Sequence, residues 1–166
     1  MKNRIRFTRL ERDYCDLRKL ETECATLFSI DAMRGNPPDT YVLYYNLTTL
    51  VKTSTGIEQH TGVRAVLYCP VDYPIDGVKV LIQSPENIFH PNIRYPHVCL
   101  SRWVPSQSLC EVVRRLAMLV TYQSYTMVEQ ESLDREACAF ARRRQDTLPV
   151  DHRQLVRNNG MRIEVW

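Results

Sequence analysis

The stretch FHPNIRYPHVCLSRWVP, from Phe89 to Pro105, decides which fold and which chemistry this sequence leads us to expect. It places a cysteine, Cys99, seven residues after an asparagine, Asn92. A thiol can carry an acyl group as a thioester, and a carboxamide can donate a hydrogen bond to the oxyanion that forms when the thioester is attacked. The stretch therefore offers a nucleophile and an oxyanion donor that folding could bring together.

Two prolines, Pro91 and Pro96, indicate that Cys99 lies on an irregular loop, because proline interrupts both helices and central strands. Reactive cysteines are typical of such partly exposed loops. The alternative is a buried structural cysteine. The five other cysteines fall in helix or strand patterns, and we expect them to be packing residues: Cys15, Cys24, Cys69, Cys110 and Cys138.

Three groups of residues in the central stretch carry a resemblance to a known family: His90-Pro91-Asn92, Val98-Cys99-Leu100-Ser101 and Trp103-x-Pro105-Ser106. Together they resemble the active-site stretch of ubiquitin-conjugating enzymes. Residues further upstream resemble the same family, namely Tyr73-Pro74 and the pairs Arg9-Leu10 and Asp13-Tyr14. The likeness runs in order from Arg4 to Arg144, and its specific part is the central motif.

The resemblance implies an α+β, ubiquitin-conjugating-enzyme-like fold with an N-terminal helix, an antiparallel β-meander, an active-site loop and C-terminal helices. It implies a single catalytic domain over residues 1–166. In such a domain Cys99 accepts an activated ubiquitin-like modifier from a cognate activating enzyme and passes it to an amine, such as a target lysine. A ligase is a further partner in the family, and no cofactor or metal is needed.

The resemblance also implies roles for the residues around Cys99. Asn92 stabilises the oxyanion, supports the loop, or does both; a plain turn asparagine after proline is the alternative. The remaining motif residues support the active-site loop: His90, Pro91, Ser101 and Trp103. In the family the first helix docks the activating enzyme, which gives a weakly marked partner site at Arg4, Arg6, Arg9 and Arg12; a solvated helix face is the alternative.

The sequence departs from the family's pattern around the site. Ser101 stands where many members have aspartate, and the loop between Cys99 and Trp103 is short. The acidic residue that many members carry beyond the second helix has no clear match, and Glu129 and Glu131 are the nearest candidates. These differences indicate a divergent member of bacterial type.

His97 suggests a different chemistry, because it precedes Cys99 by two residues and both side chains would point the same way in an extended chain. It could tune the thiol, although partners in a Cys–His dyad usually come from distant segments. A zinc site from His90, His97 and Cys99 lacks an evident fourth ligand. A Cys–His hydrolase and a non-catalytic modifier-binding variant of the fold remain as alternatives.

Composition agrees with an ordinary globular domain in a reducing compartment. The 166 residues carry a net charge of +3, which is too little to indicate a nucleic-acid partner. The scattered cysteines indicate neither a disulfide framework nor a zinc motif. With neither a signal peptide nor an apolar run that could cross a membrane, we expect a cytoplasmic protein without a membrane partner.

Hydrophobic periodicity predicts the elements that surround the loop. Helices are expected over Ile5–Phe28, from a cap at Ser108 onward, and over Ser132–Arg144; strands are expected over Tyr41–Val51, Gly62–Cys69 and Val78–Ile82. Ser108 and Glu111 have the spacing of a capping box. Gly35 to Pro38 is expected to open a loop, and Met161–Val165 to form a terminal strand or a mobile end.

Overall fold

The computed structural model describes residues 2–100 and 102–156, with only the backbone for residues 2 and 3. Ser101 and the terminal strand expected over Met161–Val165 lie outside the described residues. The helices are α1 (Lys2–Glu23), α2 (Leu109–Val120) and α3 (Arg135–Arg143), with short 3₁₀ turns at Glu129–Glu131 and Gln145–Thr147. The strands are β1 (Phe28–Gly35), β2 (Pro38–Lys52), β3 (Ile57–Tyr68), β4 (Lys79–Ser84), β5 (Ile93–Arg94) and β6 (His97–Val98).

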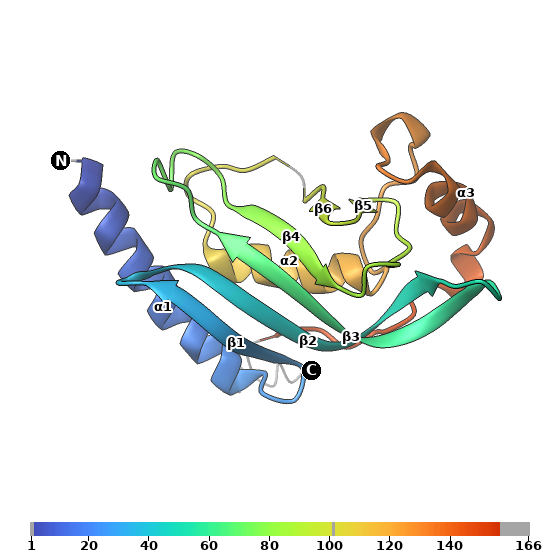
Figure 1. Ribbon diagram of the computed structural model, residues 1–166, viewed down its shortest axis with the longest axis horizontal. Coiled ribbons are helices and arrows are strands. Elements are labelled where there is room, and N and C mark those ends of the chain that lie inside the picture. The colour runs from blue at the N-terminus through green and yellow to red at the C-terminus, as the bar shows by residue number, and fades with distance from the viewer. Residues whose placement is uncertain (1, 101, 157–166) are drawn as a thin grey trace, which may run out of the picture.

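These strands form one antiparallel sheet in the order β1-β2-β3-β4-β6-β5, so the expected meander is present (Figure 1). Alternate residues of β2 are fully buried, at Tyr41, Leu43, Tyr45 and Leu47. They form one core with apolar residues of both α1 and α2, and both helices therefore cover the same face of the sheet. The fold is the α+β arrangement that the sequence leads us to expect.

The first strand and its hairpin were not expected. The apolar spacing of α1 continues in the sequence as far as Phe28, but the helix ends at Glu23, and Phe28 pairs with Tyr45 as the first residue of β1. The expected loop at Gly35 to Pro38 is instead a tight hairpin turn, in which Gly35 has a φ of +101°. The segment forms a strand rather than more helix because pairing with β2 buries Phe28 completely. The same pairing gives the backbone N–H and C=O groups of the segment hydrogen-bond partners.

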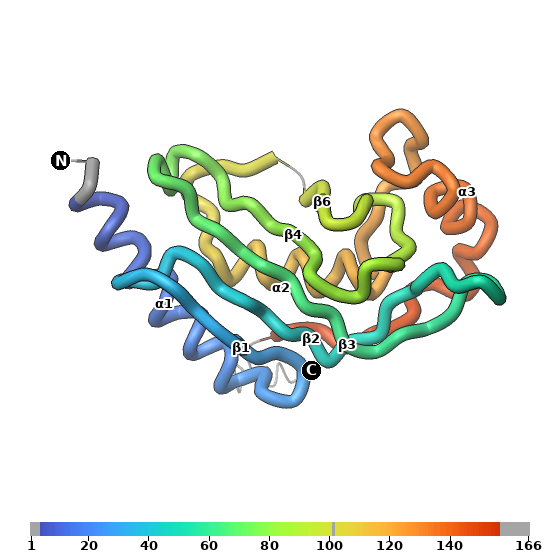
Figure 2. The backbone as a smooth tube through the Cα atoms, viewed as in Figure 1, coloured from blue at the N-terminus to red at the C-terminus, as the bar shows by residue number. Residues whose placement is uncertain are grey.

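The β2–β3 hairpin extends past the end of β4, and α3 packs against the extension (Figure 2). This contact has its own small core of Leu50, Phe89, Tyr122, Ala137 and Ala141. Helix α3 begins at Arg135 rather than at Ser132, because the Asp134 side chain accepts a hydrogen bond from the N–H of Ala137 and caps the helix there.

The capping box that the sequence predicts at the start of α2 is confirmed. The Ser108 hydroxyl accepts from the N–H of Glu111, and the Glu111 carboxylate accepts from the N–H of Ser108. These bonds give α2 a defined starting point directly after the Cys99 loop. Within the described residues no helix is long and apolar enough to cross a membrane.

Candidate functional site

Cys99 is exposed, as its predicted position on an irregular loop requires. It directly follows the two-residue strands β5 and β6, which pair Ile93 with Val98 and Arg94 with His97. The N–H of Cys99 donates to the carbonyl of Asn92 across 2.8 Å and closes the turn. The backbone therefore joins the two residues that the sequence singles out, with the cysteine just beyond the last strand pair.

The carboxamide of Asn92 is held in one orientation. Its Oδ1 accepts a hydrogen bond from the N–H of Thr126 at 2.9 Å, in the segment after α2. An N–H group needs an acceptor, and this bond therefore distinguishes the oxygen of the carboxamide from its nitrogen. Nδ2 is left without a hydrogen bond to any described residue, so it remains available as a donor.

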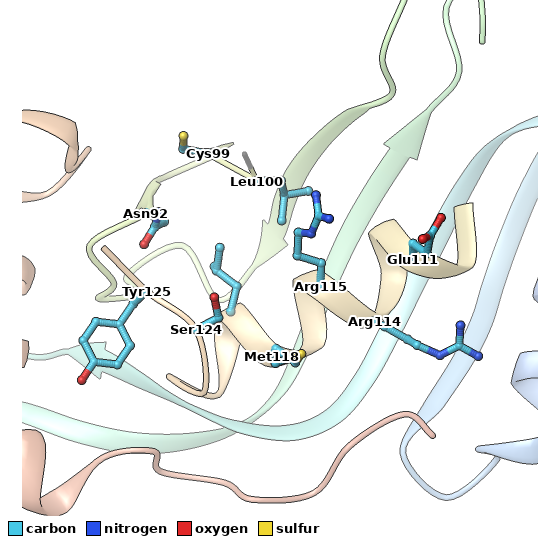
Figure 3. Close-up of a pocket in the computed structure, with 10 residues that line it drawn as sticks. Asn92, Cys99, Leu100, Glu111, Arg114, Arg115, Met118, Ser124 and Tyr125 are labelled. Atoms are coloured by element: carbon cyan, nitrogen blue, oxygen red, sulfur yellow. The ribbon is translucent and has the colours of Figure 1, made fainter. Parts of the chain in front are cut away.

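Asn92 and Cys99 line the same cavity, which has a volume of about 470 Å³ and is shown in Figure 3. Its other wall is the exposed side of α2 and the chain that follows the helix. The remaining lining residues are Leu100, Glu111, Arg114, Arg115, Met118, Leu119, Ser124 and Tyr125. An amide donor and an exposed thiol in one open cavity have the chemical components for acyl transfer.

Sequence patterns alone did not point to the α2 wall as part of the site, although the spacing of its residues carries a signal. Arg115 and Met118 are three residues apart and so share a helix face, away from the buried face of α2. Arg115 extends from α2 toward Leu100, whereas Arg114 extends away from it (Figure 3). The Nε of Arg114 donates to the carbonyl of Leu155.

His90 supports the turn from inside the protein. It is completely buried, its Nδ1 accepts from the N–H of Asn92 at 3.0 Å, and its ring packs 4.4 Å from that of Tyr122. Burial lowers the pKa of His90 to about 3, because the charged ring would lose its hydration. The ring is therefore neutral at physiological pH, with its remaining proton on Nε2.

Pro91 and Trp103 brace the loop at separate points. The buried Pro91 accepts hydrogen bonds at its carbonyl from the N–H groups of Leu133 and Asp134, just before α3. The indole Nε1 of Trp103 donates to the carbonyl of Pro74 at 2.9 Å. Each bond ties the Cys99 loop to a different neighbouring segment.

His97 is exposed on β6, where it pairs with Leu81 of β4 and Arg94 of β5. No described residue, His97 included, forms a hydrogen bond with Sγ of Cys99. Over residues 2–100 and 102–156, no group of three or more His, Cys, Asp or Glu side chains could hold a metal ion. Tuning of the thiol by His97 stays a prediction.

The acidic candidates beyond α2 do not line the cavity. Glu129 and Glu131 are exposed in the 3₁₀ turn, and Glu129 forms an ion pair with Arg142 at 3.5 Å. The one carboxylate among the lining residues is Glu111, which also serves the α2 cap.

The four arginines of α1 that are predicted as a partner site fall into two pairs. Arg6 donates to Asp39 and to the carbonyls of Cys69 and Pro70, and Arg9 forms an ion pair with Asp13. Arg4 and Arg12 are exposed and, with Ile5, Thr8 and Arg9, line a shallow hollow of about 400 Å³. Arg6 and Arg9 thus have roles within the fold, and partner binding by the four arginines stays a prediction.

The cysteines other than Cys99 are packing residues with one exception. Cys24, Cys69, Cys110 and Cys138 are buried, whereas Cys15 is exposed on α1. The prediction was wrong for Cys15 because this residue lies off the apolar stripe of the helix, where helical geometry directs it to solvent.

No protein-family model matches the chain, and no curated protein sequence matches it either. Solved structures do. A protein described as a ubiquitin-conjugating enzyme from Trypanosoma cruzi is 14% identical, with a TM-score of 0.58 over 86% of this chain and 94% of that one. Human ubiquitin-conjugating enzyme E2 G1 is 21% identical, with a TM-score of 0.49 over 67% of this chain and 90% of that one. The similarity to the first of these confirms a ubiquitin-conjugating-enzyme-like fold.

Proposed function

We propose that this chain is a conjugating enzyme for a ubiquitin-like modifier and that Cys99 carries the modifier as a thioester. The observation that supports this best is the pairing of an exposed Cys99 thiol with the oriented Asn92 carboxamide in one open cavity. A polypeptide acyl group needs such access, whereas a structural cysteine would be buried.

The reaction has two acyl transfers. In the first, the Cys99 thiolate attacks the thioester between the modifier's C-terminus and a cysteine of the activating enzyme; a new C–S bond forms and the activating enzyme's thiolate leaves. In the second, an amine attacks the Cys99 thioester, the C–N bond forms, Cys99 leaves as a thiolate, and the nitrogen loses a proton to solvent. Nδ2 of Asn92 donates to the oxyanion of the second step.

The residues around this pair have supporting roles in the proposal. His90 and Pro91 hold the turn that carries Asn92, and Trp103 braces the far end of the loop. Ser101 contributes to the same loop, and His97 tunes the thiol. The exposed Arg4 and Arg12 dock the activating enzyme or a ligase, next to Arg6 and Arg9.

The wider setting of the activity is part of the same proposal. Residues 1–166 act as a single conjugating-type domain of the bacterial kind, in the cytoplasm. Its partners are the modifier, the activating enzyme, a protein or other amine as the acceptor, and in some reactions a ligase.

The test is a mixture of this protein, candidate ubiquitin-like modifiers, a matching activating enzyme and ATP, resolved on a non-reducing gel. We expect one modifier to form an adduct that a thiol reductant removes and that Cys99→Ala abolishes. Cys15→Ser is the matched control, because it removes the other exposed described cysteine and should leave the adduct intact. Modifier binding without an adduct would favour a non-catalytic variant, and cleavage of a modifier-linked amide would favour a hydrolase.

A further inference from the structure

Asp13 of α1 carries a buried carboxylate beside the rear of the Cys99 loop, by which we mean the residues from Trp103 to the start of α2. It is 2% exposed, and its Oδ2 accepts hydrogen bonds from Arg9 Nε at 2.7 Å and from the Tyr73 hydroxyl. Its Oδ1 accepts from the N–H of Leu109, the first residue of α2, at 3.4 Å. Three segments that are distant in sequence therefore meet at one side chain.

Arg9 extends this cluster to the chain between the cysteine and α2. One terminal nitrogen of its guanidinium donates to the carbonyl of Pro105 at 3.0 Å, and the other donates to the carbonyl of Gln107. The guanidinium thus joins the Asp13 carboxylate to two carbonyls at the end of the loop. Its rigid fork of donors suits this arrangement, which a lysine could not reproduce.

Tyr73 extends the cluster to Trp103. Their rings lie 5.8 Å apart, and Nε1 of Trp103 donates to the carbonyl of Pro74. The indole also rests directly on the backbone at Gly77, where an added Cβ would lie 2.7 Å from Cβ of Trp103. The position of Trp103, four residues after Cys99, therefore depends on the Tyr73 segment.

The loop around Cys99 is held at both ends by different means. At its N-terminal end, next to β6, the N–H of Cys99 donates to the carbonyl of Asn92. At the rear, Arg9 holds the backbone at Pro105 and Tyr73 holds Trp103, and both side chains are oriented by Asp13. A buried carboxylate is costly to desolvate and contributes little net stability, so its structural value lies in specifying one arrangement of its partners.

From these contacts we infer that Asp13 is a positioning residue for Cys99: through Arg9 and Tyr73 it holds the rear of the loop so that the thiol can accept an acyl group. Only the claim that the loop position allows Cys99 to accept an acyl group rests on the proposed function. Whether Asp13 holds the loop in place does not depend on the proposed function and can be measured without any modifier.

The test uses the full chain with Cys15→Ser and Trp166→Phe, which leaves Trp103 as the sole indole and Cys99 as the one exposed described cysteine. Asp13→Asn is compared with Asp16→Asn, whose carboxylate forms ion pairs with Arg12 and Lys19 on the helix surface. The readouts are acrylamide quenching of Trp103, peptide-resolved hydrogen exchange, and the rate of thioester loading.

We expect Asp13→Asn to increase Trp103 quenching and to speed exchange in peptides covering residues 97–107, while exchange in β1 to β3 stays unchanged. Loading should slow about 10-fold, since small displacements of reacting groups are costly. Asp16→Asn should leave Trp103 quenching and exchange at residues 97–107 unchanged. A lower melting temperature with unchanged quenching and unchanged exchange at 97–107 would overturn the inference, because Asp13 would then only stabilise the fold.

Tyr73→Phe keeps the test decisive if Asp13→Asn does not fold, because it removes one hydroxyl and keeps the ring. It should reproduce the local increase in quenching and exchange, and unchanged values would overturn the inference. If both variants fold, the double variant should exceed either single one only slightly, because both act through one contact. If the unmodified chain loads no modifier at all, the proposed function fails, but quenching and exchange still decide whether Asp13 holds the loop.

Discussion

The side-chain oxygen of Asn92 is bonded to the backbone N–H of Thr126, 34 residues further along the chain. The segment after α2 therefore fixes the direction in which the amide nitrogen of Asn92 points. A turn asparagine in an isolated loop would be free to rotate. Here the carboxamide is oriented before any substrate binds, and preorganised donors are the ones that stabilise an oxyanion effectively.

Replacing Asn92 should separate the two acyl transfers. We expect Asn92→Ala to slow transfer to an amine by about two to three powers of ten, the usual effect of removing one oxyanion donor. Loading of Cys99 should remain nearly intact. Single-turnover assays of loading and of discharge to free lysine measure the two steps separately.

Asn92→Asp is the matched control for this prediction. Its carboxylate can still accept from the N–H of Thr126, but it offers no donor to the oxyanion. If the donor is what matters, discharge should be slow in both variants. Recovery of discharge in Asn92→Asp, or an equal fall in loading and discharge in Asn92→Ala, would instead indicate a structural role.

Acid should destabilise the protein through His90. Burial lowers the pKa of His90 to about 3 in the folded chain, while an unfolded chain titrates near the ordinary value of 6.5. The unfolded state therefore binds more protons between these values, and the stability is complete above about pH 6.5 and falls as the pH falls toward 3. Between pH 7 and pH 5 the loss from this residue should be about 2 kcal/mol.

Urea unfolding of wild type and His90→Asn at both pH values checks this prediction. The asparagine side chain can accept the hydrogen bond from Asn92 that Nδ1 accepts now, but it does not titrate. The free energy of unfolding should depend less on pH in the variant. Equal pH dependence in the two proteins would show that His90 does not carry the effect.

The two exposed cysteines should be the only described ones that react in the folded protein. A small alkylating reagent should label Cys15 and Cys99 under native conditions. Cys69 should be protected most strongly, because burial raises its pKa to about 12 and the thiolate is the reactive form. Intact-mass analysis should show two labels before unfolding and six after it; a third native label on a buried cysteine would contradict the burial described above.

The cap of α2 should contribute measurably to stability. Ser108→Ala removes the hydroxyl that accepts from the N–H of Glu111, and we expect a loss of about 1 kcal/mol in the free energy of unfolding. Ser106→Ala is the control, since Ser106 is exposed and two residues outside the cap. Chemical denaturation compares the two, and equal stabilities would show that the capping box contributes nothing.

Several local features were predictable because their causes lie within a few residues. The capping box depends on Ser108 and Glu111 alone, and the irregular loop at Cys99 on two nearby prolines. The strand β1 was not predictable in this way. Its residues continue the apolar spacing of α1, and only pairing with β2 shows that Phe28 belongs to the sheet.

What the sequence determined by itself was the order of most elements, the α+β class, and the two residues, Asn92 and Cys99, whose chemistry suits acyl transfer. What the tertiary structure decided was how they are held. The Thr126 bond to Asn92 and the bonds of Asp13 with Tyr73 and Leu109 join residues 34 to 96 positions apart. Local propensity has no access to such distances, because hydrogen bonds between remote segments form only where burial of the core has already brought those segments together.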